Sequence, residues 1–127
     1  MSHPTSVEIV AVMIFPGIAL CGSSSTKQGN VFYNGRPVCD DAWDNNDARV
    51  ACKMLGYVIQ TFRLGLIFLV QRYSSGSATA GSKYGSVPTN FILDDVACSG
   101  SETSLTSCSY TSSHNCGAGE GAGVICS

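Results

Sequence analysis

Four aspartates lie within eight residues of one another in the first half of the chain, with a cysteine on either side. The set comprises Asp40, Asp41, Asp44 and Asp47. Like charges at this spacing repel one another, so a cation, the amide groups of a helix terminus or basic partners must relieve the repulsion. Carboxylate oxygens are the ligands that Ca²⁺ and Mg²⁺ prefer. The cluster therefore indicates either a divalent-cation site or a solvated acidic surface whose aspartates cap turns.

The remaining acidic residues include a second pair and one isolated glutamate. Asp94 and Asp95 follow the apolar run Phe91-Ile92-Leu93, and capping a turn is the alternative to cation binding for this pair. Glu120 lies in a glycine-rich segment between two cysteines, residues 117–123. This segment lacks the Lys-Ser/Thr pair of a phosphate-binding loop, so its glycines favour a tight approach of the backbone to neighbouring segments.

Other chemistries find little support in the sequence. The residues of a possible zinc site are Cys108, His114, Cys116 and Cys126. They lack the paired Cys-x-x-Cys spacing of zinc sites. Nothing in the sequence orients His114 as a base toward Cys116, and the chain has neither a nucleophile elbow nor a metalloprotease motif. A net charge of −2 without any run of basic residues argues against nucleic acid as a physiological partner.

The cysteine content indicates a secreted protein. Seven cysteines in 127 residues, with only 13% charged residues, are typical of one small domain stabilised by disulfides in an oxidising compartment. Six cysteines can pair in 15 ways, so the sequence alone leaves the connectivity open.

An apolar run at the N-terminus has two interpretations. Residues 7–22 have about the length of a secretory signal and are too short to span a membrane comfortably. We interpret residues 1–22 as a cleaved signal peptide or, alternatively, as an apolar N-terminal segment that forms a buried first strand. Residues 23–127 are expected to form a single domain. Removal of Cys21 with the signal would leave six cysteines, whereas its retention leaves Cys21 as an unpaired thiol.

The elements that must position the acidic residues can be read from local patterns. Asn34-Gly35 between two β-rich stretches predicts a hairpin over residues 31–38. A helix should begin near Asn45 or Asn46 and end at Gly56 in a left-handed conformation. Apolar positions recur within it at Ala48, Ala51, Cys52 and Leu55. Residues 76–89 should form a loop, residues 91–93 a short strand and residues 102–108 a helical turn.

Several motifs together resemble the scavenger receptor cysteine-rich (SRCR) domain in its six-cysteine form. They are Val38-Cys-Asp-Asp-Ala-Trp-Asp44, Cys98-Ser-Gly-Ser-Glu102, Leu105-Thr-Ser-Cys108 and the segment from Cys116 to Cys126. The resemblance extends over residues 18–127 and follows the family's order. It implies an α+β fold, a small disulfide-rich domain in which a curved antiparallel β-sheet cradles one α-helix. Tyr57 stands where the eight-cysteine form carries a further cysteine.

The resemblance also implies pairings and a site. The implied disulfides are Cys39–Cys116, Cys52–Cys126 and Cys98–Cys108. Asp40, Asp41 and Glu120 match the acids that bind Ca²⁺ or Mg²⁺ in the family, although Gly121 replaces the acid that usually follows the glutamate. Asp94 and Asp95 are the candidates for a second cation.

Relative to the family, residues 58–73 look inserted, since their removal joins Leu55-Gly56-Tyr57 directly to the polar stretch that begins at Ser74. Translated intron sequence, a genuine hydrophobic loop and an additional strand are the three interpretations.

These observations lead us to expect a non-catalytic extracellular binding module, either secreted or in the ectodomain of a cell-surface receptor. It would recognise polyanionic or protein ligands through a cation-bridged acidic patch, with Arg36 or Lys83 completing the charge complementarity. No segment of the sequence is long enough to predict a transmembrane span. The alternatives are an accessory domain of a larger secreted enzyme, such as a serine protease or amine oxidase, and an adhesion repeat from a tandem array.

Overall fold

The computed structural model describes residues 17–61 and 67–127 of the chain. Its elements, in chain order, are β1 (Ile18–Cys21), β2 (Gln28–Tyr33), β3 (Arg36–Pro37), α1 (Asn45–Gly56), β4 (Tyr57–Thr61), β5 (Ile67–Gln71), β6 (Gly76–Thr79), β7 (Asp94–Ala97), the 3₁₀ turn η1 (Leu105–Ser107), β8 (Ser109–Thr111) and β9 (Gly123–Cys126).

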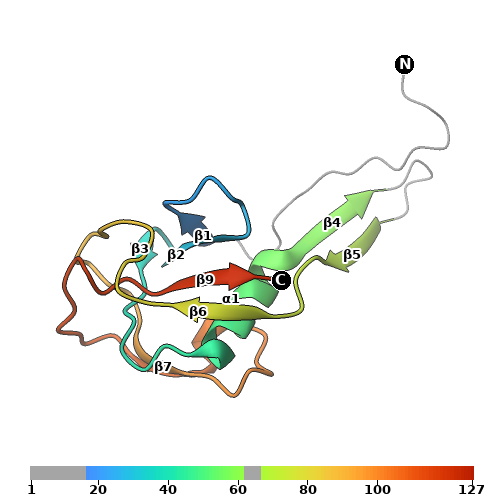
Figure 1. Ribbon diagram of the computed structural model, residues 1–127. Coiled ribbons are helices and arrows are strands. Elements are labelled where there is room, and N and C mark those ends of the chain that lie inside the picture. The colour runs from blue at the N-terminus through green and yellow to red at the C-terminus, as the bar shows by residue number, and fades with distance from the viewer. Residues whose placement is uncertain (1–16, 62–66) are drawn as a thin grey trace.

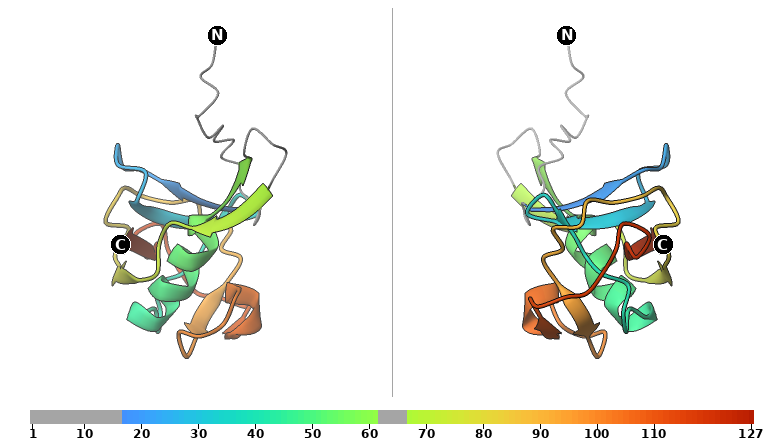
Figure 2. Two further views of the ribbon diagram at one scale, coloured as in Figure 1. Left: turned by 90° about the vertical axis from the view of Figure 1, so that its right-hand side faces the viewer. Right: turned by 90° about the vertical axis from the view of Figure 1, so that its left-hand side faces the viewer.

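The main sheet has the strand order β1-β2-β9-β6, with β3 paired to β2 outside this path. All pairings within it are antiparallel, and β2 and β6 both pair with β9, so strands from the two ends of the domain meet at its centre. Helix α1 lies against one face of this sheet, and β7 and β8 lie beyond the helix (Figures 1 and 2). This arrangement confirms the α+β prediction of antiparallel sheet with one helix.

The hairpin between β2 and β3 is confirmed at its predicted turn. Asn34 and Gly35 have positive φ values of 51° and 77°. Both residue types tolerate this region, which a two-residue hairpin turn requires. Tyr33 then pairs with Arg36, and the chain runs on through Pro37 toward the acidic cluster.

Helix α1 is confirmed, but two details of its ends differ from the prediction. The N-terminal cap is Asp44 and not an asparagine, since the Asp44 Oδ1 accepts hydrogen bonds from the backbone N–H groups of Asn46 and Asp47. Gly56 is the last helical residue and has no positive φ. Glycine is needed there for space: a Cβ on Gly56 would lie 2.7 Å from the backbone nitrogen of Tyr73.

The helix buries a wider face than the predicted stripe. Ala48, Ala51 and Cys52 are fully buried, and the helix also buries Val50 and Met54. The core around this face draws on the main sheet, on β7 and on the η1 turn, and its other large members are Ile18, Val31, Val38, Trp43, Leu93, Val96, Leu105 and Val124. The helix therefore supplies one side of a core that the short strands could not form alone.

Three disulfides are present in the structure, and they match the pairing that the resemblance implies. They are Cys39–Cys116, Cys52–Cys126 and Cys98–Cys108, with Cα–Cα distances of 6.2, 5.4 and 4.8 Å. The second bridge fastens α1 to β9. Gly76 of β6 lies directly beside this bridge. Glycine is required there, because a Cβ at that position would clash with the Cys52 Sγ.

The N-terminal strand begins before the expected domain boundary at residue 23. Residues 18–21 form β1 at the edge of the main sheet and pair with β2. Ile18 is buried, and Cys21 is an exposed free cysteine. The described sheet therefore includes the last part of the apolar N-terminal segment. The rest of the expected signal peptide of residues 1–22, namely residues 1–16, lies outside the described residues.

Most of the 58–73 segment forms a separate antiparallel pair of strands. β4 and β5 run from the Tyr57–Gln71 pair to the Thr61–Ile67 pair, and they project from the end of α1 away from the main sheet (Figure 1). Of the three interpretations of this segment, the backbone pairing of β4 with β5 is most similar to the additional strand. Residues 62–66 between them are outside the described part.

Deleting residues 58–70 and joining Tyr57 to Gln71 through two glycines is expected to leave the domain folded. The two joined residues already face each other across the ladder, and a Gly-Gly turn suits a two-residue hairpin. Loop length has little effect on stability, so unfolding free energy should change by less than about 1 kcal/mol. Soluble yield should rise, because the removed residues are mostly apolar. Loss of a cooperative unfolding transition would show instead that this segment is part of the core.

Two predictions for the segments after β5 differ from the structure: one expected loop is a strand, and one expected strand begins later in the sequence. Residues 76–79, expected to be loop, form the edge strand β6, since their small side chains allow pairing with β9 despite a weak strand propensity. The strand expected at residues 91–93 begins three residues later, as β7. The helical turn within residues 102–108 is confirmed as η1. None of the helices in the described part of the chain has the length and apolar character needed to cross a membrane.

Candidate cation site

Asp40, Asp41 and Glu120 converge at one end of the main sheet. One carboxylate oxygen from each, together with the Cys39 Sγ, lies within 4.8 Å of the others. All three acidic side chains are partly exposed, whereas Cys39 is buried. The cysteine sulfur is engaged in a disulfide, so the oxygen atoms are the available ligands of this group.

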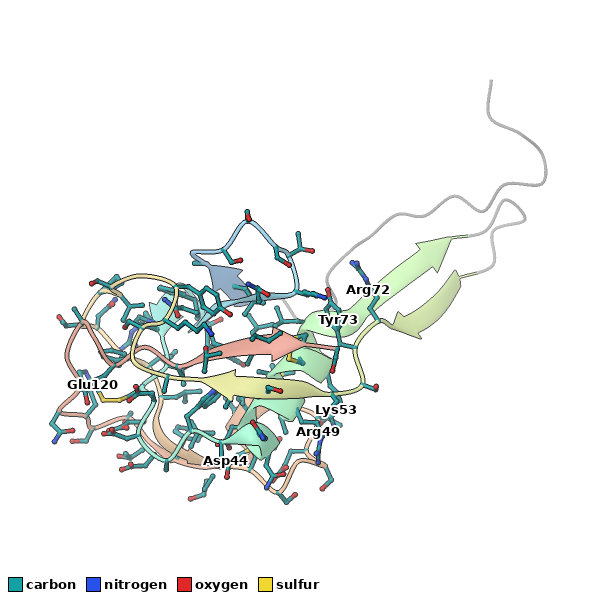
Figure 3. All side chains as sticks on the ribbon, in the orientation of Figure 1. Asp44, Arg49, Lys53, Arg72, Tyr73 and Glu120 are labelled. Carbon is teal, nitrogen blue, oxygen red and sulfur yellow. A yellow bond between two sulfur atoms is a disulfide. The ribbon has the colours of Figure 1, made fainter. Side chains whose placement is uncertain are left out.

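Backbone pairing brings these distant segments together. Cys39 forms an antiparallel bridge with Gly121, and the Asp40 N–H donates to the Glu120 carbonyl at 2.8 Å. The disulfide from Cys39 to Cys116 closes the other end of the glycine-rich segment. Figure 3 shows Glu120 at this end of the domain, far along the sheet from Arg72. Asp40 and Glu120, which are 80 positions apart in the sequence, are thus brought together by main-chain contacts as well as by the disulfide.

Two backbone amides orient the outer carboxylates. The Gly81 N–H donates to the Asp40 Oδ2 at 2.7 Å. The Gly117 N–H donates in the same way to the Glu120 Oε2. Each carboxylate thereby keeps its second oxygen available while its orientation is fixed, which is how neighbouring groups commonly preorganise metal ligands.

The electrostatic environment of Asp41 disfavours its ionised form. Burial raises the pKa of Asp41, and the carboxylates of Asp94, Glu120, Asp40 and Asp95 raise that pKa further. Every charged group that shifts this pKa carries the same sign. A bound divalent cation would reverse this repulsion.

Asp94 lies closer to the site than the sequence suggested. An oxygen of Asp94, an oxygen of Asp41 and the sulfurs of the Cys39–Cys116 bridge form a second compact group. The parallel bridge between Val38 and Leu93 places the next residues of both segments side by side. The Val38–Leu93 bridge could not be predicted from the sequence. The position of Asp94 directly after the apolar run Phe91-Ile92-Leu93 was nevertheless a signal that it could belong to a site.

Asp95 is not part of either group. It is exposed and has a φ of 51°, and its N–H donates to the Asp94 Oδ1 at 2.7 Å. The structure thus separates the pair that was predicted to act together: Asp94 is 3% exposed and faces Asp41, whereas Asp95 acts on the site only through its charge.

The two basic residues proposed to complement the acidic patch have other contacts. The Arg36 guanidinium donates to the carbonyl groups of Asn90 and Phe91, both at 2.8 Å. Arg36 therefore positions the segment that leads to Asp94. The Lys83 Nζ lies over the Tyr84 ring, 6.0 Å from its centroid.

The residues of the alternative zinc and thiol sites are occupied elsewhere. Cys108, Cys116 and Cys126 all form disulfides, so none is available as a thiolate. The His114 Nδ1 accepts a hydrogen bond from the Cys116 N–H, and its ring packs edge-on against Phe91. The 3.9 Å contact from the Cys116 Sγ to the Asp41 Oδ2 is not a hydrogen bond, because a disulfide sulfur carries no proton.

The other two members of the four-aspartate cluster, Asp44 and Asp47, stabilise the start of helix α1. Asp47 is fully buried, and it accepts hydrogen bonds from the N–H groups of Asp44 and Cys98, both at 2.8 Å. Together with the Asp44 cap this forms a reciprocal capping arrangement at the start of α1. Burial raises the pKa of Asp47 to about 6, although the two N–H donors oppose the shift.

This raised pKa predicts a pH dependence of stability. The folded domain holds the Asp47 proton more tightly than the unfolded chain does, so Asp47 should stabilise the fold most below pH 4 and lose that contribution as pH rises through 6. Between pH 4.5 and 6.5 the unfolding free energy of the wild type should fall relative to that of Asp47→Asn, by on the order of 2 kcal/mol. Urea titrations in EDTA measure both slopes. Parallel curves for the two proteins would contradict the assignment.

Gly121 is explained by packing around the site. A Cβ there would lie 3.0 Å from both the Ser82 Oγ and the Val87 Cγ1. The Gly121 N–H also donates to the Ser82 Oγ. Glycine at this position lets the loop with Ser82 and Val87 come close, and the same loop carries the Gly81 N–H that orients Asp40. The family's usual acid at position 121 would not leave this space.

Comparisons with known proteins agree with this architecture. The sequence model of the family described as "Scavenger receptor cysteine-rich domain" matches residues 21–127. A "Scavenger receptor cysteine-rich domain superfamily protein" of Patiria pectinifera is 44% identical over 115 residues, covering 86% of this chain and 9% of the relative. The macrophage receptor MARCO of Mus musculus is 40% identical over 117 residues, covering 89% of this chain and 19% of the receptor.

Two solved structures share the fold. The dimeric form of the SRCR domain of mouse MARCO has a TM-score of 0.59 and 42% identity, with 79% of this chain and 86% of that chain covered. The third SRCR domain of murine neurotrypsin has a TM-score of 0.67 and 30% identity, with 86% and 94% covered. The chain spans less than a fifth of the length of the two relatives named above. On its sequence, fold and disulfides, the chain belongs to the scavenger receptor cysteine-rich domain family.

Proposed function

We propose that this domain is a non-catalytic extracellular binding module that holds Ca²⁺ or Mg²⁺ between Asp40, Asp41 and Glu120. The observation that carries the proposal is the convergence of the three carboxylates within 4.8 Å at a partly exposed position. The bound cation would leave coordination positions open to solvent, since three carboxylates do not complete the six to eight oxygen ligands that Ca²⁺ takes. An anionic group of a ligand can occupy those positions.

The electrostatics support an anionic ligand that binds through the cation. Without a cation, this end of the domain presents only acidic charge around Asp41, which would repel a polyanion. A divalent cation reverses the local field and supplies a direct bond to a sulfate, phosphate or carboxylate oxygen. The ligand class is therefore a polyanion or an acidic segment of a protein, presented at a cell surface.

The relatives support a receptor role. MARCO is named a macrophage receptor, and its SRCR domain matches this chain in sequence and in fold. We infer the same kind of setting for this domain: outside the cell, secreted or within the ectodomain of a receptor.

A second candidate is an accessory role in a longer protein with a different main activity. The match to the third SRCR domain of neurotrypsin, and the small share of its relatives that this chain spans, are the observations that favour it. A catalytic domain encoded in the same transcript would decide for this candidate, and the cation site would then serve to position a substrate or partner.

Binding to immobilised dextran sulfate tests the proposal. Wild-type domain should bind in 2 mM Ca²⁺, on the order of the affinities of extracellular calcium modules, and should be released by EDTA. Asp41→Asn and Glu120→Gln should bind at the EDTA level under both conditions. Asp95→Asn is the matched control, because it removes a nearby charge outside the converging group and asparagine tolerates the positive φ. Equal binding by all variants with and without EDTA would refute the cation-bridged mode.

A further inference from the structure

A cavity of about 430 Å³ lies away from the candidate cation site, with which it shares no lining residue. Its walls come from strand β1, the β1–β2 loop, the end of helix α1 and the two residues that follow β5. Figure 3 shows two of these residues, Arg72 and Tyr73, well separated from Glu120. This volume is within the range of small-molecule sites.

The floor of the cavity is apolar. Ile18 is buried, and Leu20 and Leu55 are partly buried against the same core cluster. Ala19 also lines the cavity, although it is exposed and its side chain lies on the opposite face of β1 from those of Ile18 and Leu20. These side chains offer a surface for an alkyl chain and no hydrogen-bonding group.

The rim is polar and carries the positive charge of Arg72. Ser23, Ser25 and Thr26 line it with hydroxyl groups. The Arg72 side chain is exposed, and its guanidinium lies over the Tyr73 ring, 5.6 Å from the centroid. The backbone N–H of Arg72 donates to the Gly56 carbonyl at 2.7 Å, which fixes the base of this side chain against the helix end. A guanidinium held this way can bind an anionic headgroup through paired hydrogen bonds.

We propose that this cavity binds an anionic amphiphile, with the alkyl chain on the apolar floor and the sulfate, phosphate or carboxylate headgroup at Arg72 and the rim hydroxyls. The separation of apolar floor and cationic rim matches the two parts of such a ligand. A saccharide would leave most of its hydroxyl groups against Ile18, Leu20 and Leu55, where they lack partners. The site shares no residue with the cation site, so binding is independent of Ca²⁺.

Calorimetric titration of the domain with sodium decyl sulfate, below its micellar concentration and in EDTA, tests this inference. Wild-type protein should bind one decyl sulfate. Arg72→Gln should weaken binding about tenfold, since it removes a charged hydrogen-bond donor. Leu20→Trp should abolish binding, because Leu20 is a partly buried lining residue and a larger side chain there fills the cavity. Arg49→Gln removes a cationic side chain of α1 that does not line the cavity and should bind like the wild type.

Neutral decyl maltoside and inorganic sulfate separate the two parts of the ligand. Both should bind at least tenfold more weakly than decyl sulfate. Equal binding of decyl maltoside, or an unchanged affinity in Arg72→Gln, would overturn the role of the headgroup. Unchanged binding in Leu20→Trp, with its melting temperature preserved, would overturn the cavity as the site.

Discussion

The Asp41→Asn domain is expected to melt at the same temperature with and without Ca²⁺, whereas the wild-type melting temperature should rise on addition of the cation. A ligand that binds only the folded state stabilises it by about 2.7 kcal/mol at a hundredfold excess over Kd. Asp41 is the residue to change because it belongs to both carboxylate groups and its pKa is raised by all of its acidic neighbours.

The same substitution should leave the cation-free domain equally stable or slightly more stable at neutral pH. The raised pKa of Asp41 means that ionisation of this group opposes folding as pH rises, and asparagine removes that effect. Asp95→Asn should retain the Ca²⁺ response. A wild-type melting temperature that does not respond to millimolar Ca²⁺ or Mg²⁺, or an Asp41→Asn protein that responds fully, would contradict the site.

Removing the bridge between helix and sheet, as Cys52→Ala with Cys126→Ala, is expected to cause a large loss of stability. The bridge closes a separation of 74 residues, for which restriction of the unfolded chain predicts about 4 kcal/mol. Both half-cystines are almost fully buried, so the truncation also leaves a cavity between α1 and β9. For a small domain this approaches the whole free energy of unfolding. Denaturant titration and circular dichroism at 37 °C measure the loss.

The short bridge provides the comparison. Cys98 and Cys108 are separated by only 10 residues, so replacing both by alanine should cost about 3 kcal/mol. The double variant at this bridge should remain folded at room temperature. If the Cys98/Cys108 double variant is less stable than the Cys52/Cys126 double variant, loop closure does not determine which bridge stabilises more. Local packing around η1 would then be the dominant contribution.

Local chemistry made several elements predictable. The Asn34-Gly35 turn requires residues that tolerate positive φ, and only a few types do. The spacing of Ala48, Ala51 and Cys52 sets the buried face of α1 whatever lies opposite. The association of Asp40, Asp41 and Glu120 rested on a family resemblance, since nothing in their spacing links residues so far apart in the chain.

The elements that were missed depend on partners distant in sequence. β6 is a strand because β9 provides hydrogen bonds to it, not because Gly76–Thr79 prefers that state. Asp94 joins Asp41 through the bridge between Val38 and Leu93. The cap at Asp44 was displaced by one residue because Asp44 and Asp47 can accept from each other's backbone, an exchange that propensities for single positions do not capture.

Isothermal titration calorimetry of Ca²⁺ into the oxidised, metal-free domain at pH 7.4 tests the central claim most directly. The account predicts binding at about millimolar concentration or tighter, with Asp40→Asn, Asp41→Asn and Glu120→Gln each losing most of the heat and Asp95→Asn retaining it. Binding to Ca²⁺ should also weaken progressively as the pH falls, because the raised pKa of Asp41 lets protonation compete with the cation. The absence of any heat for Ca²⁺ and Mg²⁺ at millimolar concentration would contradict the account, and the three carboxylates would then form only a solvated acidic surface.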